Sequence, residues 1–373
     1  MNLRRPTSAQ GFRPEWITNN VLLVALVLLC SYFAAQTPFF LDAGNAKVIL
    51  QNNATLGIVV VALTCLVISG GVDLSVGSAV GLSGTLTALA SVEWGLGDVQ
   101  AAGIGVLAGV GVGLVNGILC GLLEFNPVIV TLGMLGAVRG LTLLIHHDQV
   151  FGLNGSLPAL ASAQIAGIPV IAVIALAAFA VGAVFLRTTV WGPYLFAIGT
   201  NREAAFLAGL PVRALPFALY LLSGTTAGIA GVLLAARLNG AAPGQQGINL
   251  ELQALTVVLL GGVAFSGGRG RLLGVFTGWI FLGVLENGLT LTNVTPFVET
   301  LVEGLALVFA AGLEALSTVL ATRLADRRKA VARLSAGPGA SPIMGDGAAP
   351  GGETADGDAP DSAGGETAVA AGR

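Results

Sequence analysis

Few residues in this chain are suited to chemistry, and they fall into two groups. The first lies in AIGTNREAAFLAGLP at residues 197–211, a polar stretch between long apolar segments. Two alanines on one face, Ala204 and Ala205, would let another protein approach closely, and Glu203 offers a charged contact, so the stretch predicts a docking surface. The second group comprises ionisable residues within apolar segments, namely Asp73, Arg139 and Glu286. Charges at such positions mark solute pathways in membranes.

Other kinds of chemistry find no support in the sequence. A Walker A loop needs a lysine next to Ser or Thr to reach nucleotide phosphates, but Lys47 and Lys329 stand in GNAKV and RRKAV. His146, His147 and Asp148 are consecutive, and neighbouring helical residues point about 100° apart, which disfavours a metal site. No Ser–His or paired-carboxylate arrangement supports hydrolysis. We therefore expect that the chain is not an enzyme and binds no cofactor itself.

Composition places the chain in a membrane. Of its 373 residues, 54% are hydrophobic and only 10% charged, and the mean hydropathy is +0.86. Soluble domains carry roughly 25% charged residues. The 54 glycines suit close helix–helix contacts in a bilayer. A net charge of −3 gives no electrostatic basis for binding nucleic acid. The three cysteines (Cys30, Cys65 and Cys120) have neither metal-ligand nor disulfide spacing.

The expected fold is an all-α membrane protein with about ten transmembrane helices. A helical crossing needs about 20 mostly apolar residues, and about ten segments qualify. The expected spans are 18–35, 54–69, 74–92, 99–123, 127–145, 167–186, 215–236, 252–265, 272–292 and 297–320. The second and eighth are the least regular, since glycines interrupt the second and the eighth is short.

Basic residues predict the orientation, because cytoplasmic loops carry an excess of Lys and Arg. With the amino terminus inside, the outer loops receive only Lys47 and Arg237. The inner segments receive Arg4, Arg5, Arg13, Arg187, Arg202, Arg213, Arg269, Arg271, Arg323, Arg327, Arg328, Lys329 and Arg333. Both termini and the 197–211 stretch are therefore predicted to lie in the cytoplasm.

This orientation divides the chain into three parts. Residues 1–17 form a cytoplasmic amino-terminal segment, and residues 18–322 form the transmembrane domain. Residues 323–373 form a cytoplasmic tail, rich in Gly, Ala, Pro, Ser, Asp and Glu beyond Arg333. This composition buries too little apolar area to offset the entropy of ordering, so most of the tail is predicted to be disordered.

A glycine-rich break, SGGVDLSVG, separates the second and third spans, and the predicted orientation puts this turn on the cytoplasmic side. Gly70 and Gly71 can end one helix, and Asp73 can cap the next by accepting a hydrogen bond from the N–H of Ser75 or Val76. The negative charge at that helix start also opposes the helix dipole favourably. A plain helix-connecting turn explains this local structure equally well.

Two further breaks follow the same pattern. Asn126 and Pro127 are an N-cap and a first-turn proline that open the fifth span. The stretch SGGRGR at 266–271 predicts a tight turn with two arginines on the cytoplasmic side. Turns of this kind do not by themselves indicate a function.

The order of these motifs along the chain carries a resemblance. EAAFLAGLP at 203–211 resembles the EAA loop of permease subunits of bacterial ABC importers. In order, VISGGVDLSVGSAVGLSG, FNPVIVTLGMLGAVRGL, WGPYLFAIGTNREAAFLAGL, and LTVVLLGGVAFSGGRGRLLGVFTG followed by LGVLENGL resemble the ribose/xylose-type sugar permeases of these importers. The resemblance covers residues 54–316. The family often has a basic residue before the glycine that here follows Glu303, which leaves that position without an assigned role.

The resemblance implies a permease subunit of the bacterial cytoplasmic (inner) membrane that forms the pathway for a monosaccharide. An extracytoplasmic sugar-binding protein would deliver the sugar, and a second permease copy would complete a homodimer. A cytoplasmic ABC ATPase with tandem cassettes would use ATP and Mg. In this family the EAA loop forms a short cytoplasmic helix that docks on the ATPase, so the loop at about 188–213 would couple the two subunits. Its coupling residues would be Arg202, Glu203, Ala204, Ala205 and Gly209.

Alternatives remain at this point. Permeases for branched-chain amino acids or urea-like solutes share the general layout. An ion-coupled secondary transporter would use intramembrane charges, of which this chain has few.

The intramembrane charges also allow a pairing prediction. At 1.5 Å per residue, Arg139 lies roughly 18 Å beyond Pro127, and Glu286 roughly 21 Å beyond Leu272. An unpaired arginine at this depth costs about 2.5–3.5 kcal/mol. We therefore expect Arg139 to pair with Glu286 or to face the aqueous pathway, with Asn287 beside them.

Overall fold

The computed structural model describes residues 14–312, with side-chain environments from residue 21 onward. The chain divides into two units, Met1–Val319 and Leu320–Arg373, and the second lies outside the described residues. The expected disorder of the tail and the cytoplasmic location of both termini therefore stay predictions.

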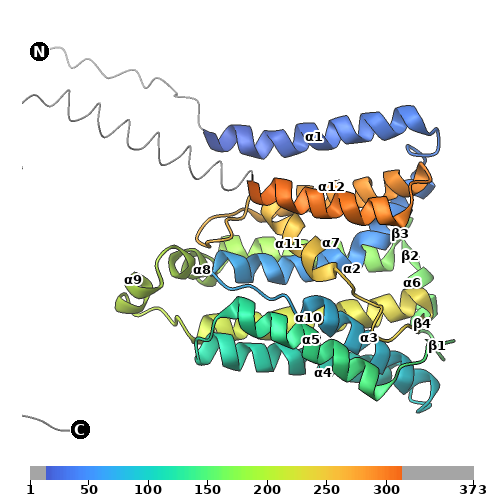
Figure 1. Ribbon diagram of the computed structural model, residues 1–373, viewed down its shortest axis with the longest axis horizontal. Helices are drawn as coiled ribbons and strands as arrows, with labels where there is room; N and C mark the ends of the chain where they lie inside the picture. Colours follow the sequence, from blue (N-terminus) through green and yellow to red (C-terminus); the bar gives the residue numbers. More distant parts are fainter. Residues whose placement is uncertain (1–13, 313–373) are drawn as a thin grey trace, which may run out of the picture. The chain divides into compact units, whose positions relative to one another are not determined.

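Helices make up most of the described chain (Figure 1). Six stretches are long and apolar enough to cross a membrane: α2 (Ala43–Ile68), α4 (Asp98–Asn116) with its π-helical continuation η1 (Gly117–Leu122), α5 (Pro127–Ile145), α7 (Val170–Thr188), α10 (Ala214–Leu238) and α12 (Leu272–Leu291). Shorter apolar helices are α3 (Val76–Val92) and α11 (Leu250–Leu260), and α1 (Pro14–Gln36) is apolar over Val21–Gln36. Residues 296–312 are also helical. These findings support a helical membrane protein, while the expected number of ten spans stays a prediction.

The largest boundary difference concerns α2, which begins eleven residues before the predicted start at 54. This additional stretch contains three polar residues, Asn45, Asn52 and Asn53. In the structure α12 satisfies two of them. Asn53 and Trp279 exchange two hydrogen bonds of 2.8 Å, and Asn45 exchanges two of 2.9 Å with Asn287. Polar side chains thus fit into an apolar bundle when another helix pairs them.

The all-α prediction missed two small sheets and two of three short helices, whereas the helix at 202–207 is the one that the family resemblance implied. β1 (Val150–Phe151) pairs antiparallel with β4 (Gly240–Ala241), and β2 (Gln164–Ile165) pairs with β3 (Ile168–Pro169). The short helices are α6 (Leu157–Ser162), α8 (Trp191–Thr200) and α9 (Arg202–Leu207). Segments of two to ten residues are too short for hydropathy patterns to identify.

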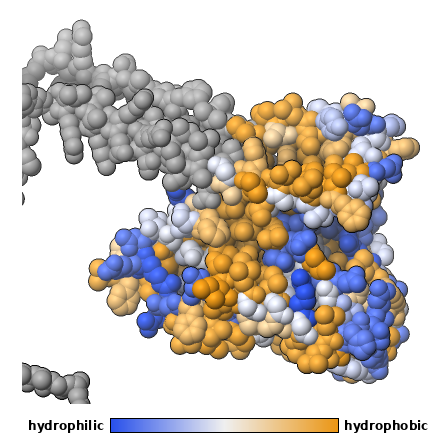
Figure 2. Space-filling view, in the orientation of Figure 1, coloured by the Kyte–Doolittle hydropathy of each residue, from blue (hydrophilic) through white to orange (hydrophobic). Residues whose placement is uncertain are grey.

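Glycines bring the central helices into backbone contact. On α4, Gly109 and Gly113 lie against Gly224 and Gly228 of α10, so that an added Cβ at any of them would meet backbone atoms. Small residues at such crossings let van der Waals packing hold membrane helices together. Helix α2 passes through the centre of the bundle, where its residues from Asn53 onward are buried. Figure 2 shows apolar side chains over the helical middle and hydrophilic ones at the α8–α9 end and at the opposite end.

Candidate pathway and docking sites

Helix α9 is a short helix with a defined cap at each end. The side chain of Asn201 accepts a 2.9 Å hydrogen bond from the N–H of Ala204, which satisfies a donor of the first turn. At the other end, Gly209 has φ +79°, and its N–H donates to the carbonyl of Phe206. The N–H of Leu210 donates to the carbonyl of Ala205, completing a Schellman motif. The sequence AIGTNREAAFLAGLP therefore dictates one helical turn that stops at glycine.

The exposed face of α9 differs from the one that the sequence predicted. Ala205 is buried while Ala204 is exposed, so the two alanines do not share one face. Neighbouring helical residues point about 100° apart, which explains the error. Phe206 is 65% exposed and Leu207 80% exposed, beside the exposed Glu203. Helix α9, which carries these side chains, stands at one end of the bundle (Figure 1). The exposed surface of α9 thus combines apolar and acidic contacts for a partner.

Gly209 also has a different role from the predicted close approach. No atom of residues 14–312 beyond the local backbone lies within 4 Å of the position that a Cβ would occupy. The positive φ is the constraint, because residues with a side chain rarely adopt it. Gly209 therefore ends the helix and leaves open space beside it.

An ionic clamp, formed by Glu124, Arg202 and Arg213, holds the α9 loop against the turn between η1 and α5. The Nε of Arg213 donates to Oε1 of Glu124, and Nη2 of Arg202 lies 3.4 Å from the same oxygen. Arg202 also donates a 3.0 Å hydrogen bond to the carbonyl of Val212. The hydrogen bond from Arg213, together with the charges of both arginines, lowers the pKa of Glu124 below its ordinary value. The sequence reasoning missed Glu124 because only basic residues were counted in deriving the orientation.

Two of the predicted breaks, the glycine-rich loops that contain Gly70 and Gly267, meet near the carboxyl end of α8. The N–H of Gly268 donates a 2.8 Å hydrogen bond to the carbonyl of Ile68, which joins the α11–α12 loop to the end of α2. Gly199 on α8 fits between them, since a Cβ there would meet the carbonyl of Ile68 and the N–H of Gly268. Gly267 packs against Gly70 in the same way. The segment that leads into α9 is therefore in backbone contact with both glycine-rich loops.

Asp73 lies at the centre of a buried polar cluster. Its Oδ1 accepts hydrogen bonds from the N–H and hydroxyl of Ser75, at 3.0 and 2.7 Å, and a 3.3 Å bond from Asn116. Its Oδ2 accepts a 2.8 Å bond from Ser223 on α10. The expected hydrogen bond from the N–H of Ser75 is confirmed. Asn116 and Ser223 could not be assigned from sequence, because they come from distant helices.

The depth of Asp73 corrects the expectation of a turn on the cytoplasmic side. Ser223 stands nine residues after Ala214, roughly 14 Å along α10 at 1.5 Å per residue. Its partner Asp73 must lie at the same level, so the loop from Ser69 to Ser75 folds back into the bundle. Helix α3 therefore begins in the interior.

The expected pairing of Arg139 with Glu286 is wrong. The Nη2 of Arg139 instead donates a long 3.5 Å hydrogen bond to the carbonyl of Gly247. Glu286 accepts a 3.1 Å bond from Gln253, which also donates to Glu303. The prediction matched the depths of the two residues but not their positions around the bundle. Helix α5 packs mainly on α3, whereas α12 packs on α2, α1 and α11.

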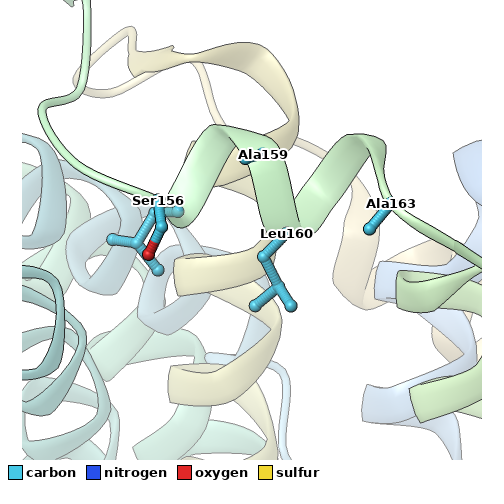
Figure 3. Close-up of a pocket in the computed structure, with 5 residues that line it drawn as sticks. Ser156, Ala159, Leu160 and Ala163 are labelled. Atoms are coloured by element: carbon cyan, nitrogen blue, oxygen red, sulfur yellow. The ribbon is translucent and has the colours of Figure 1, made fainter.

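An open hollow of about 340 Å³ lies beside α6 (Figure 3). Its mainly apolar lining comes from Ser156, Leu157, Ala159, Leu160 and Ala163. The N–H and hydroxyl of Ser156 both donate to Asp98, which fixes the start of α6 against α4. Among the described residues, no cluster of three or more His, Cys, Asp or Glu side chains could hold a metal ion.

These features define a multi-pass helical membrane protein in which α3 begins inside the bundle and α9 is exposed at one end. Residues 46–311 match the family described as "Branched-chain amino acid transport system / permease component". The chain belongs to this family of permease components, and it is a multi-pass protein of the bacterial cytoplasmic membrane.

Curated relatives align along most of the chain. It is 35% identical over 294 residues to the ribose import permease protein RbsC of Bacillus subtilis (strain 168), covering 78% of this chain and 91% of the relative. It is 34% identical to the L-arabinose ABC transporter permease protein AraH of Azospirillum brasilense, covering 82% and 90%. It is 30% identical to RbsC of Escherichia coli (strain K12), covering 83% and 98%. No solved structure matches the chain.

Proposed function

We propose that this chain is the permease subunit of an ATP-driven importer and forms the membrane pathway for a monosaccharide. An extracytoplasmic binding protein delivers the sugar, and a cytoplasmic ABC ATPase with tandem cassettes hydrolyses ATP with Mg. Two copies of the chain form the pathway as a homodimer. The names of the relatives support a pentose such as ribose or arabinose as the solute.

The observation that carries the coupling part of this proposal is the exposed surface of α9. Phe206 and Leu207 project from a capped turn that the ionic clamp attaches to the bundle. Apolar side chains exposed at the end of the bundle favour burial in a partner. Through Gly199, a displacement of α8 and α9 would reach both glycine-rich loops. The chain thus has a contact for the ATPase and a path for the movement that hydrolysis produces.

The test is uptake of labelled pentose into vesicles that contain the chain with its ATPase and binding protein. We expect uptake of ribose or arabinose that requires all three components and ATP. Uptake of leucine or urea instead would support the permeases for amino acids or urea-like solutes. Uptake driven by an ion gradient without the ATPase would support a secondary transporter, which the relatives do not favour.

A further inference from the structure

The segment between β4 and α11 descends into the bundle along a face of α3 that consists of glycines. An added Cβ at Gly77 would meet the carboxylate of Glu251 and the carbonyl of Gly247. At Gly81 and Gly84 it would meet the backbone and side chain of Gln246. The spacing of these three glycines, four and three residues apart, puts them on one helix face. A larger residue at any of them would exclude the segment.

The segment reaches the middle of the membrane. Gly84 packs against Gly231 on α10, seven residues before the outer end of that helix at Leu238. Gly77 lies seven residues deeper on α3, and Glu251 is beside it. At 1.5 Å per residue the two steps add to roughly 20 Å, within a hydrocarbon core of about 30 Å. Figure 1 agrees, because α11 begins far along the bundle from β4.

Two acceptors on this segment have no hydrogen-bond partner among the residues that the structure describes. Oε2 of Glu251 and Oε1 of Gln246 are both buried and unpaired, on residues that are 5% and 7% exposed. The amide nitrogen of Gln246 is used in a 3.2 Å bond to the carbonyl of Gly240. Leaving a buried acceptor unsatisfied costs about 1–3 kcal/mol, and more when it is charged. Unpaired acceptors at mid-membrane therefore need a donor that arrives from elsewhere.

Arg139 provides a donor group at the same place. Its hydrogen bond to the carbonyl of Gly247 is long at 3.5 Å, and that carbonyl lies beside Gly77 together with the carboxylate of Glu251. One turn further along α5, the side chain of Leu143 covers Gly244. Helix α5 therefore closes over the segment from 244 to 251. Among the six long apolar helices, α5 is the least buried. Within the most apolar 18 residues of each helix, 17% are buried in α5 and 78% in α2. Figure 2 shows hydrophilic atoms near the middle of this face, where α3, α5 and α10 lie.

We propose that Arg139, Gln246 and Glu251 form a transit site that binds the hydroxyl groups of the sugar when α5 moves away from the segment. A sugar hydroxyl donates to one acceptor and accepts from a donor, which matches two free acceptors and one guanidinium. The guanidinium also balances the charge of Glu251 when no sugar is present. This inference rests on the proposed function and names the residues that would contact the substrate.

The first test compares transport with hydrolysis in the reconstituted complex at saturating loaded binding protein. Glu251→Gln and Arg139→Gln should lower labelled pentose uptake per ATP hydrolysed at least ten-fold, while stimulated hydrolysis stays within two-fold of wild type. The matched control is Asp148→Asn, which changes an exposed carboxylate in the loop beyond α5. This control should leave the ratio unchanged. A proportional fall in uptake and hydrolysis in both variants would indicate a merely structural role and would overturn the site.

The second test needs no transport activity. In a background without Cys30, Cys65 and Cys120, Gln246→Cys should react with a small membrane-impermeant thiol reagent during ATP turnover and much less without ATP. As a control we use Ala254→Cys, at a buried position on α11 about one turn after Glu251. This cysteine should stay unlabelled in both conditions. If the cysteine at 246 does not react in a complex that hydrolyses ATP, the site is excluded. If the wild-type complex hydrolyses ATP but takes up no pentose, the proposed function is wrong. Labelling of the cysteine at 246 then still shows whether the site becomes accessible during ATP turnover.

Discussion

Two acidic side chains, Asp73 and Glu251, stand at the beginnings of two helices that start inside the bundle. Both are buried, but their surroundings differ. Asp73 accepts four hydrogen bonds, and both of its oxygens are used. Glu251 has one oxygen with no partner and a cation nearby on a loosely covered helix. The comparison teaches that depth and charge alone do not indicate a role. Hydrogen bonding distinguishes an acid that holds helices together from one that is free to bind a ligand.

Removing Asp73 should have the largest effect on stability. Asp73→Ala leaves donors of Ser75, Asn116 and Ser223 without their acceptor, at about 1–3 kcal/mol for each unsatisfied group. We expect a loss of about 3 kcal/mol or more, seen as a large drop in the apparent melting temperature in detergent. Glu251→Gln keeps the side-chain volume and should shift that temperature little. Equal drops for the two variants would contradict the comparison.

The backbone contacts between α4 and α10 should give the next largest effect. Gly109→Ala puts a methyl group into the backbone of Gly224 and Gly228, and overpacking of this kind costs about 1–3 kcal/mol. Gly111, on the same helix, has no atom of the described part of the chain within 4 Å of the Cβ position, apart from its own helix backbone. Gly111→Ala should therefore be neutral or stabilising by up to about 1 kcal/mol. The apparent melting temperatures of Gly109→Ala and Gly111→Ala should therefore shift in opposite directions or by clearly different amounts.

The ionic clamp should give the smallest effect on stability, because exposed ion pairs contribute about 0.2–1 kcal/mol. Since the pKa of Glu124 is lowered in the folded chain, its contribution is complete above the ordinary pKa. The contribution is lost as pH falls through the lowered value. Proteolysis at the α9 loop should therefore increase in acid for wild type. In Glu124→Gln the loop should already be sensitive at neutral pH, and a wild-type loop that is insensitive to pH would contradict the clamp.

The sequence predicted the helical membrane class well, because hydropathy over about 20 residues reflects the bilayer directly. It also located the breaks at Gly70 and Gly267, since glycine has specific backbone roles. The sequence did not predict the side-chain pairings correctly, because these depend on which helices are neighbours in the bundle. Arg139 and Glu286 share a depth but lie on helices with different neighbours, and Asn45 pairs with Asn287 across 242 residues of sequence. The role of Glu251 could not be found from sequence, because it depends on the glycine face of α3.

The roles within the α9 loop were only partly predictable. Its helical turn follows from local capping by Asn201 and Gly209, which sequence patterns capture. The burial of Ala205 and the exposure of Phe206 depend on how the loop lies against the bundle. Glu124 joins the loop from 78 residues earlier than Arg202, a separation that local patterns do not cover.

The central claim is that α9 docks on a cytoplasmic ATPase, and site-specific photo-cross-linking tests it most directly. A photoreactive residue at Leu207 should cross-link to the ATPase in membranes that contain the active complex. The same residue at Leu144, which is equally exposed but lies on α5 within an apolar span, should not. No cross-link from position 207 in a complex that hydrolyses ATP, or an equal cross-link from position 144, would contradict the account.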